Sequence, residues 1–260
     1  MKVLYLECEM GAAGDMMLSA LYELIEDKAG FLSELNDAGI PGVEYTACQV
    51  STHGTSGTHV DVMIDGEAEE YPEGGGPKNR KENKNEKRPH YTTLEYMHAM
   101  VDSLELPEET KKHIRNIYDS IAKAEAEVHG TPPGAIHFSK LGTMDAVADI
   151  TGVCYALQKL KAEKIVISPI HVGCGTIQCS CGTLPVPPPA VEKLLAGAPI
   201  YGGEIEGELC TPTGAALLMY FVDDFGHAPE MTTEKEGHGM GTRSFEDRAS
   251  YLKAVIGEAV

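Results

Sequence analysis

Cysteine residues that could bind a metal ion are concentrated between residues 168 and 216, together with one histidine. Four of the seven cysteines and one of the ten histidines lie there. Thiolate and imidazole groups are soft or borderline ligands that suit nickel, zinc or copper. The stretch is therefore a candidate metal or substrate platform, and its closely spaced ligands are His171, Cys174, Cys179 and Cys181. The spacing Cys179-Ser-Cys181 is too short for a structural zinc knuckle, and the alternative is a proline-rich surface loop.

The elements around this stretch would hold it in place. Residues 164–170 form an apolar run that predicts a buried strand leading into it. Pro188-Pro189 predicts the start of a short helix that runs through Leu195. Thr211 can cap a further helix that has Pro212 at its first position and a body extending from 215 to 225.

A second group of candidate ligands lies on an expected helix over residues 143–160. Asp145 and Asp149 are four residues apart, so they share one face near the helix start. Two like charges at this spacing repel each other unless a cation or the helix dipole relieves them. The pair is therefore a candidate for metal or ligand binding, and the alternative is two solvated first-turn aspartates.

The beginning of the chain resembles an anion-binding arrangement. Residues 2–8 predict a buried strand, residues 10–15 a glycine turn, and residues 16–25 a helix. Free N–H groups at a helix start attract anions such as phosphate. The turn lacks the lysine of a P-loop and the third glycine of a dinucleotide fingerprint. Asp15 can instead cap the helix, and a plain tight turn is the alternative.

The remaining patterns complete an α/β fold with mixed sheets flanked by helices. Residues 44–50 and 58–64 predict paired strands, with His53 and His59 at exposed polar positions. A long helix ends at Gly130 and places His129 on its solvated edge. Four further local patterns complete the expected elements. They are a capping box from Thr92 to Glu95, a strand-like piece at 136–138, a glycine-rich turn at 237–243 and a closing strand at 251–256.

Composition divides the chain into three segments. Residues 1–66 form a strand-turn-helix and hairpin unit, residues 67–90 a flexible loop or linker, and residues 91–260 a helical and platform region packed against the first unit. Residues 78–88 carry six basic and two acidic side chains and little that could enter a core. The expected loop is therefore 67–90.

Net charge limits the classes of partner. The 260 residues carry a formal charge of −19, which argues against nucleic acid and anionic membranes and is compatible with cations. No apolar run has transmembrane length, and acidic residues interrupt the N-terminal apolar stretch. Seven cysteines without a secretion signal lead us to expect reduced thiols in the cytoplasm.

Many short motifs in one order resemble the LarC family, whose members insert nickel into the nickel-pincer cofactor. The resemblance covers nearly the whole chain. The motifs that carry it are Gly11-Ala-Ala-Gly-Asp-Met16, Ala124-Glu-Ala-Glu-Val-His-Gly130, His137-Phe138, Asp145 with Asp149-Ile150, Ser168-Pro169, Cys179, Gly182 with Leu184-Pro-Val-Pro187, Glu208, Thr211-Pro-Thr-Gly-Ala-Ala216 and Gly239-Met-Gly-Thr-Arg243.

The resemblance implies a nickel insertion lyase. In the family, Ni(II) enters pyridinium-3,5-bisthiocarboxylic acid mononucleotide in a CTP-dependent cyclometallation. The product serves lactate racemase and related racemases and epimerases. CTP, with Mg(2+) or Mn(2+), belongs to a C-terminal domain that we expect to be absent here, so a separate C-terminal LarC-like subunit is an expected partner. A homo-oligomer is a further possibility that the sequence leaves open.

The resemblance also suggests roles for the candidate residues. Cys179 and Cys181, with His137 or His171, would hold nickel, while Asp145 and Asp149 would bind a metal or orient a ligand. The mononucleotide phosphate would lie at the two turn-and-helix starts, whose residues are Gly11, Gly14, Asp15, Thr211, Thr213 and Gly214.

This chain departs from the family pattern at several positions. The family's usual His-Phe-His-Glu is His137-Phe138-Ser139-Lys140 here, and Cys181 stands where a histidine is usual. The family often has a histidine-rich loop where residues 78–88 lie. Two alternative functions follow, a nickel chaperone without chemistry and a metal-free enzyme or binding protein for a phosphorylated small molecule.

Overall fold

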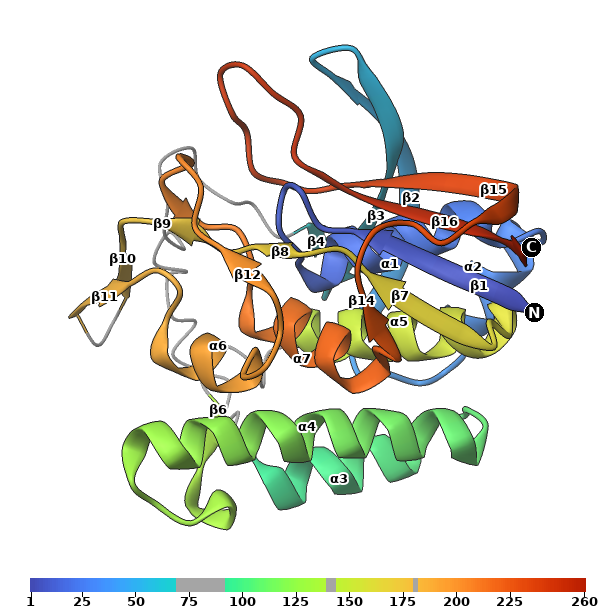
Figure 1. Ribbon diagram of the computed structural model, residues 1–260. Coiled ribbons are helices and arrows are strands. Elements are labelled where there is room, and N and C mark those ends of the chain that lie inside the picture. Colours follow the sequence, from blue (N-terminus) through green and yellow to red (C-terminus); the bar gives the residue numbers. More distant parts are fainter. Residues whose placement is uncertain (69–91, 139–143, 180–181) are drawn as a thin grey trace.

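A mixed β-sheet forms the centre of the structure. The computed structural model describes residues 1–68, 92–138, 144–179 and 182–260. The strands of the sheet are β1 (Lys2–Glu7), β2 (Val43–Thr52), β3 (Thr55–Ile64), β4 (Glu67–Ala68), β7 (Lys164–Ile167), β14 (Asp224–Phe225), β15 (Met231–Met240) and β16 (Tyr251–Ala259). Their order is β14-β7-β1-β16-β15-β3-β2, with β4 beside β3. Strands from both ends of the chain thus share one sheet (Figure 1).

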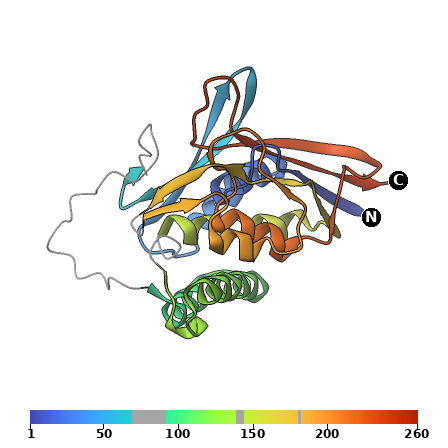
Figure 2. The same ribbon diagram turned by 60° about the vertical axis from the view of Figure 1, so that its left-hand side comes forward.

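Helices cover the sheet in two layers. They are α1 (Gly14–Leu24), α2 (Lys28–Asn36), α3 (Leu94–Ser103), α4 (Glu108–His129), α5 (Met144–Leu160), α6 (Pro189–Leu194) and α7 (Pro212–Phe221), and a 3-10 turn spans Pro133–Ala135. α1, α5 and α7 lie against the sheet, and α3 and α4 form a further layer beyond them (Figures 1 and 2). The α/β class expected from the sequence, with helices flanking mixed strands, is confirmed.

Short strand pairs connect these layers. They are β5 (Thr92–Thr93) with β6 (His137–Phe138), β8 (Ile170–His171) with β12 (Ile200–Tyr201), β9 (Gly173–Cys174) with β13 (Gly207–Glu208), and β10 (Thr176–Cys179) with β11 (Gly182–Pro185). The apolar run predicted as one strand over 164–170 is therefore two, β7 and the start of β8. The cap of α3 is also shifted from the expected residue, because Thr93 accepts the hydrogen bond from the Tyr96 N–H.

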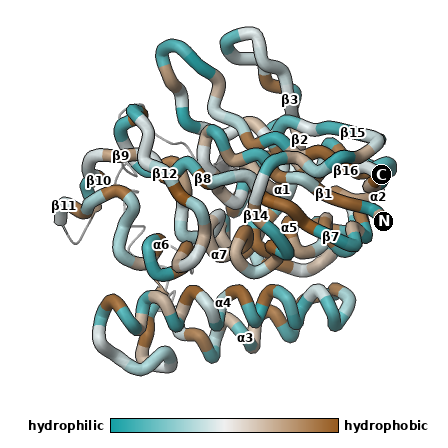
Figure 3. The backbone as a smooth tube through the Cα atoms, viewed as in Figure 1, coloured by the Kyte–Doolittle hydropathy of each residue, from teal (hydrophilic) through white to brown (hydrophobic). Residues whose placement is uncertain are grey.

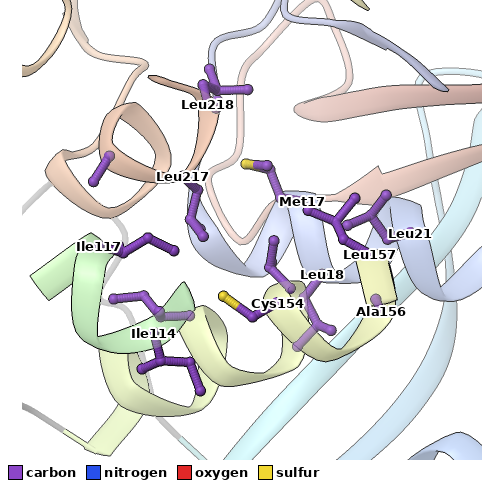
Figure 4. Close-up of a cluster of buried hydrophobic side chains, with 14 of the residues drawn as sticks. Met17, Leu18, Leu21, Ile114, Ile117, Cys154, Ala156, Leu157, Leu217 and Leu218 are labelled. Atoms are coloured by element: carbon purple, nitrogen blue, oxygen red, sulfur yellow. The ribbon is translucent and has the colours of Figure 1, made fainter. Parts of the chain in front are cut away.

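The main core lies between the sheet and the helices. Apolar residues follow the inner faces of the sheet and helices in the hydropathy view (Figure 3). Side chains of α1, α4, α5 and α7 meet in the interior (Figure 4), among them Met17, Leu18, Ile114, Cys154 and Leu217, each at most 1% exposed. Burial of this apolar surface is the main stabilising term for such a layered domain. It holds the starts of α1, α5 and α7 in fixed relative positions.

The sequence interpretation of residues 237–243 as a glycine-rich turn is wrong. Residues up to Met240 belong to the long strand β15, which pairs with β16 in antiparallel fashion. A Cβ atom at Gly239 would overlap the carbonyl oxygen of Met16, and one at Gly237 would lie 2.6 Å from that of Ala20. Glycine is needed here because the backbone of α1 lies directly on the strand.

Two sequence expectations concern segments with little or no structural description. The predicted loop over 67–90 lies outside the described residues apart from Glu67 and Ala68, which form β4. Ser139, Lys140 and Cys181 also lie outside them. Among the helices of the described part, none combines the length and the apolar character needed to cross a membrane.

Candidate functional site

One cavity of about 950 Å³ collects most of the residues singled out in the sequence. Its walls come from the starts of α1, α5, α6 and α7, the end of α4, strand β3 and the β10–β11 hairpin. Residues far apart in the chain therefore face one space. The predicted site residues that line it are Gly14, Asp15, His137, Asp145, Asp149, Cys179, Thr211 and Thr213.

Backbone hydrogen bonds bring the starts of α1 and α7 together. The Ala12 N–H donates to the carbonyl oxygen of Leu209 at 3.1 Å, and the Thr211 N–H donates to that of Ala12 at 3.0 Å. The Thr211 side chain then caps α7 by accepting from the Gly214 N–H at 3.2 Å. Helix starts carry partial positive charge, so this junction is suited to an anionic group.

Gly11 and Gly214 shape that junction without lining the cavity. Gly11 has a positive φ of 81°, and a Cβ atom there would overlap the carbonyl group of Leu209. A Cβ at Gly214 would overlap the carbonyl oxygen of Ala12. Both glycines allow close backbone packing, and the predicted contact with a ligand falls instead to Gly14 and Thr213.

The Asp15 carboxyl lies at the start of α1 beside a histidine. Burial raises its pKa, while nearby His59 and hydrogen bonds from the backbone N–H groups of Met16, Asp15 and Thr242 act in the opposite direction. These backbone donors include N–H groups of the first helical turn. Because Asp15 itself uses them, an external anion has more open access to the start of α7 than to that of α1.

His59 and Asp61 are functional candidates that sequence reasoning missed. His59, expected at an exposed position, has a side chain only 12% exposed. Its Nδ1 lies 2.8 Å from the Met240 carbonyl oxygen and its Nε2 lies 3.1 Å from Asp61 Oδ1. Both residues line the cavity. The available signal was their separation of two in a strand, which places both side chains on the same side.

Asp145 and Asp149 both line the cavity from the first turns of α5. The interpretation of two solvated aspartates fails for Asp149, which is 6% exposed. A Cβ at Gly14 would lie 2.5 Å from Asp149 Oδ2, so this carboxyl lies against the start of α1. It is also close to two buried phenols. Burial, and after it the charge of Asp149, raises the pKa of Tyr45 and Tyr118.

Only some of the cysteine and histidine candidates can be placed at the cavity. His137 on β6 and Cys179 at the end of β10 both line the cavity. Cys179 is in a disulfide, which differs from the reduced thiol expected from the sequence. Cys181 lies outside the described residues. A metal–thiolate bond at Cys179 therefore requires prior reduction.

His171 is separated from the other predicted ligands. Its Nδ1 lies 2.8 Å from the Glu9 carbonyl oxygen and its Nε2 lies 3.0 Å from that of Gly202. The ring stacks on Tyr201 with centroids 4.5 Å apart. Because backbone carbonyls face both nitrogens and the residue does not line the cavity, we leave His171 out of the proposed ligand set.

No metal site is ready-made in the part of the chain that the structure describes. Within those residues, no group of three or more His, Cys, Asp or Glu side chains is arranged to hold a metal ion. The cavity does gather single carboxylates from several elements. They are Asp15, Asp61, Glu125, Asp145, Asp149 and Glu208. Carboxylates at these positions make the electrostatic potential in the cavity negative, which attracts cations.

Glu125, at the end of α4, provides a pH-dependent test of this acidic lining. Burial raises its pKa, and His129, 3.5 Å away, only partly opposes this. A raised pKa means that the charged form is disfavoured in the folded state, so stability is lost as pH rises through that pKa. We expect Glu125→Gln to raise the melting temperature near pH 7. The gain should disappear as pH falls towards about 4, where the glutamate is protonated in both states.

Thermal unfolding of both proteins between pH 4 and pH 8 measures this difference. A constant gain at every pH would indicate altered packing rather than the loss of a charge. The matched control is Glu127→Gln, because Glu127 lies two residues further along the same helix and does not line the cavity.

The scaffold and cavity together define an α/β protein with an acidic cavity at the junction of several helix starts. The comparison with protein families identifies it more closely. The family described as nickel insertion protein matches residues 4–260, and the chain belongs to that family.

Individual relatives support the same assignment. The chain is 35% identical over 260 residues to the pyridinium-3,5-bisthiocarboxylic acid mononucleotide nickel insertion protein of Geobacillus kaustophilus, covering 99% of this chain and 60% of that protein. It is 33% identical over 259 residues to the protein of the same name from Desulfitobacterium hafniense strain DCB-2, covering 99% and 59%. The chain thus spans about three fifths of the length of these relatives. No solved structure matches it.

Proposed function

We propose that this chain binds Ni(II) and pyridinium-3,5-bisthiocarboxylic acid mononucleotide in the cavity and contributes to the insertion of nickel that makes the nickel-pincer cofactor. The names of its relatives supply the substrate. One observation carries the proposal: residues from five separate segments that were selected for metal or phosphate binding line the same cavity. Its volume of about 950 Å³ is at the upper end of the range for small-molecule sites and leaves room for both substrates.

Different groups of the lining would bind the two substrates. Asp145 and Asp149, with His137, supply the oxygen and nitrogen donors that a borderline cation such as Ni(II) accepts. The capped start of α7, with the buried side chain of Thr213, is available to the phosphate. Nickel would thus be delivered from protein ligands to the sulfur atoms of the mononucleotide, because sulfur is the softer donor.

Several finer features extend the proposal. We include CTP, with Mg(2+) or Mn(2+), bound by a C-terminal LarC-like partner; transfer of the product to lactate racemase or a related racemase; a cytoplasmic location; and a possible homo-oligomer. A nickel chaperone without chemistry and a metal-free protein for phosphorylated ligands are the competing functions.

Binding measurements on the purified chain test the proposal. We expect Ni(II) and the mononucleotide each to bind in titration calorimetry, and His137→Ala to weaken nickel binding. The matched control is His227→Ala, because His227 is also exposed but does not line the cavity. Nickel binding without mononucleotide binding would favour the chaperone. Mononucleotide binding without nickel binding would favour the metal-free protein. If the chain bound neither nickel nor the mononucleotide, the proposal would be rejected.

A further inference from the structure

The last residue of β15, Met240, and the three residues after it contact cavity-lining groups from three distant parts of the chain. The Met240 carbonyl oxygen faces His59 Nδ1 at 2.8 Å. The Thr242 N–H donates to the Asp15 carboxyl. Arg243 donates from Nη2 to the Glu206 carbonyl oxygen at 2.7 Å and from Nη1 to that of Glu208 at 2.9 Å. The segment 240–243 therefore connects β3, α1 and β13 at the cavity, although Met240 and Arg243 do not line it.

We propose that Arg243 is a positioning residue for Glu208. Its two carbonyl partners flank Gly207, so the guanidinium holds both ends of the turn that carries Glu208, which lines the cavity. The inference rests on the proposed function for its nickel readout, but the geometric claim about Glu208 does not depend on nickel.

The local geometry is specific to arginine. The planar guanidinium carries donors in a fixed fork that can serve two acceptors at once, whereas a lysine ammonium acts as a single point charge. Phe245 adds a second restraint, with the Arg243 Cζ atom 4.9 Å from its ring centroid. Arg243 is thus held in one orientation even though it lies at the surface.

Gly207 is shaped to receive this side chain. Its φ is +99°, in the region that favours glycine, and a Cβ atom there would overlap Arg243 Nη2. On the other side of the turn, Glu208 pairs with Gly173 between β13 and β9. The Leu209 that follows accepts from the Ala12 N–H and leads to the α7 cap at Thr211. A displacement of this turn therefore moves Glu208 relative to the starts of α1 and α7.

Substitutions at Arg243 test the inference by nickel affinity and by a direct probe of Glu208. Glu208 belongs to the acidic lining that would attract Ni(II) under the proposed function. We therefore expect Arg243→Met to lower nickel affinity about 10-fold, the lower end of the effect of losing an outer-shell partner. Arg243→Lys should recover little, because it cannot serve both carbonyls. Gly207→Ala should reproduce the loss from the opposite side of the contact. The melting temperature of the two Arg243 variants should change little, since the hydrogen bonds that they lose lie at the surface.

A double-mutant cycle separates positioning from general damage. If Arg243 acts through Glu208, Arg243→Met should have no further effect in a Glu208→Gln background. The matched control is Arg248→Met, because Arg248 lies in the same loop, is exposed and pairs only with its neighbour Asp247 in the contacts described. Effects of Arg243→Met and Glu208→Gln that add in full would overturn the inference.

The second readout needs no metal. The carboxyl ¹³C chemical shift of Glu208, measured by NMR in the metal-free protein, should change in Arg243→Met and remain the same in Arg248→Met. If wild-type protein binds neither nickel nor mononucleotide, the proposed function fails and this shift still decides the positioning role. An unchanged Glu208 shift in Arg243→Met would reject that role.

Discussion

Replacement of Gly239 by alanine should destabilise the protein by about 3 kcal/mol or more, the upper end of the range for overpacking a filled interior. A Cβ atom at this position of β15 would overlap the Met16 carbonyl oxygen and the Ala20 N, and would lie 2.9 Å from Ala20 Cβ. Two of these atoms are backbone atoms of α1 and the third is the Cβ of Ala20, so none of them can rotate aside. The substitution can be accommodated only if the helix and the strand separate.

Urea unfolding followed by circular dichroism measures this loss. The matched control is Gly226→Ala, because a Cβ there has nothing within 4 Å and its backbone is not in the positive-φ region. That variant should stay within about 0.5 kcal/mol of wild type, as surface substitutions generally do. Equal unfolding midpoints for Gly239→Ala and wild type would show that α1 does not lie on β15 as described.

Gly239 also shows where sequence reasoning about the fold reaches its limit. Apolar patterns were sufficient for β1, α1 and α5, because each of these elements carries its own pattern. The helix body expected over 215–225 was too long, because α7 ends at Phe221 and residues 224–225 form β14. β15 carries two glycines where its inner face meets α1, and glycine in a sequence indicates a turn. Only the helix packed against the strand explains those glycines. That helix is more than 200 residues away in sequence, so local pattern could not reveal it.

The candidate site divides in a similar way. Gly14, Asp15, Thr211 and Thr213 could be predicted because turns and helix starts have local signatures. The spacing of His59 and Asp61 was a signal for one shared face, but it did not place that face at the cavity, because the position of His59 depends on the Met240 carbonyl oxygen of a strand that was itself missed. His171 has ligand chemistry in sequence, but its ring nitrogens face backbone carbonyls. Residue type indicated which groups could bind, and the tertiary contacts decide which of them face the cavity.

The largest functional effect should follow from neutralising Asp145 and Asp149 together. Asparagine keeps the shape of each side chain and removes the negative charge that a cation requires. Under the proposed function, both residues contact nickel directly. The double variant Asp145→Asn/Asp149→Asn should therefore lose more nickel affinity than the roughly 10- to 100-fold that loss of an outer-shell partner causes.

Two opposing terms act on the stability of this double variant. A carboxylate at a helix start contributes about 0.3–1 kcal/mol through the helix dipole, and this is lost. The opposing, stabilising contribution comes from removing the buried charge of Asp149, which is 6% exposed and lies beside the buried phenols of Tyr45 and Tyr118. Because the terms have opposite sign, we expect unfolding free energy to change by no more than about 1 kcal/mol.

Isothermal titration with Ni(II) and urea unfolding of the same preparations separate binding from folding. Glu95→Gln is the matched control, since Glu95 is an exposed first-turn acid of α3 outside the cavity lining. It removes the same kind of helix-start charge without touching the proposed site, so nickel affinity should be retained. If the double variant unfolds readily while its folded fraction binds nickel with wild-type affinity, the two aspartates support the junction of α1 and α5 rather than the metal. The Asp149 carboxyl against Gly14 would then be a packing contact between those two helices.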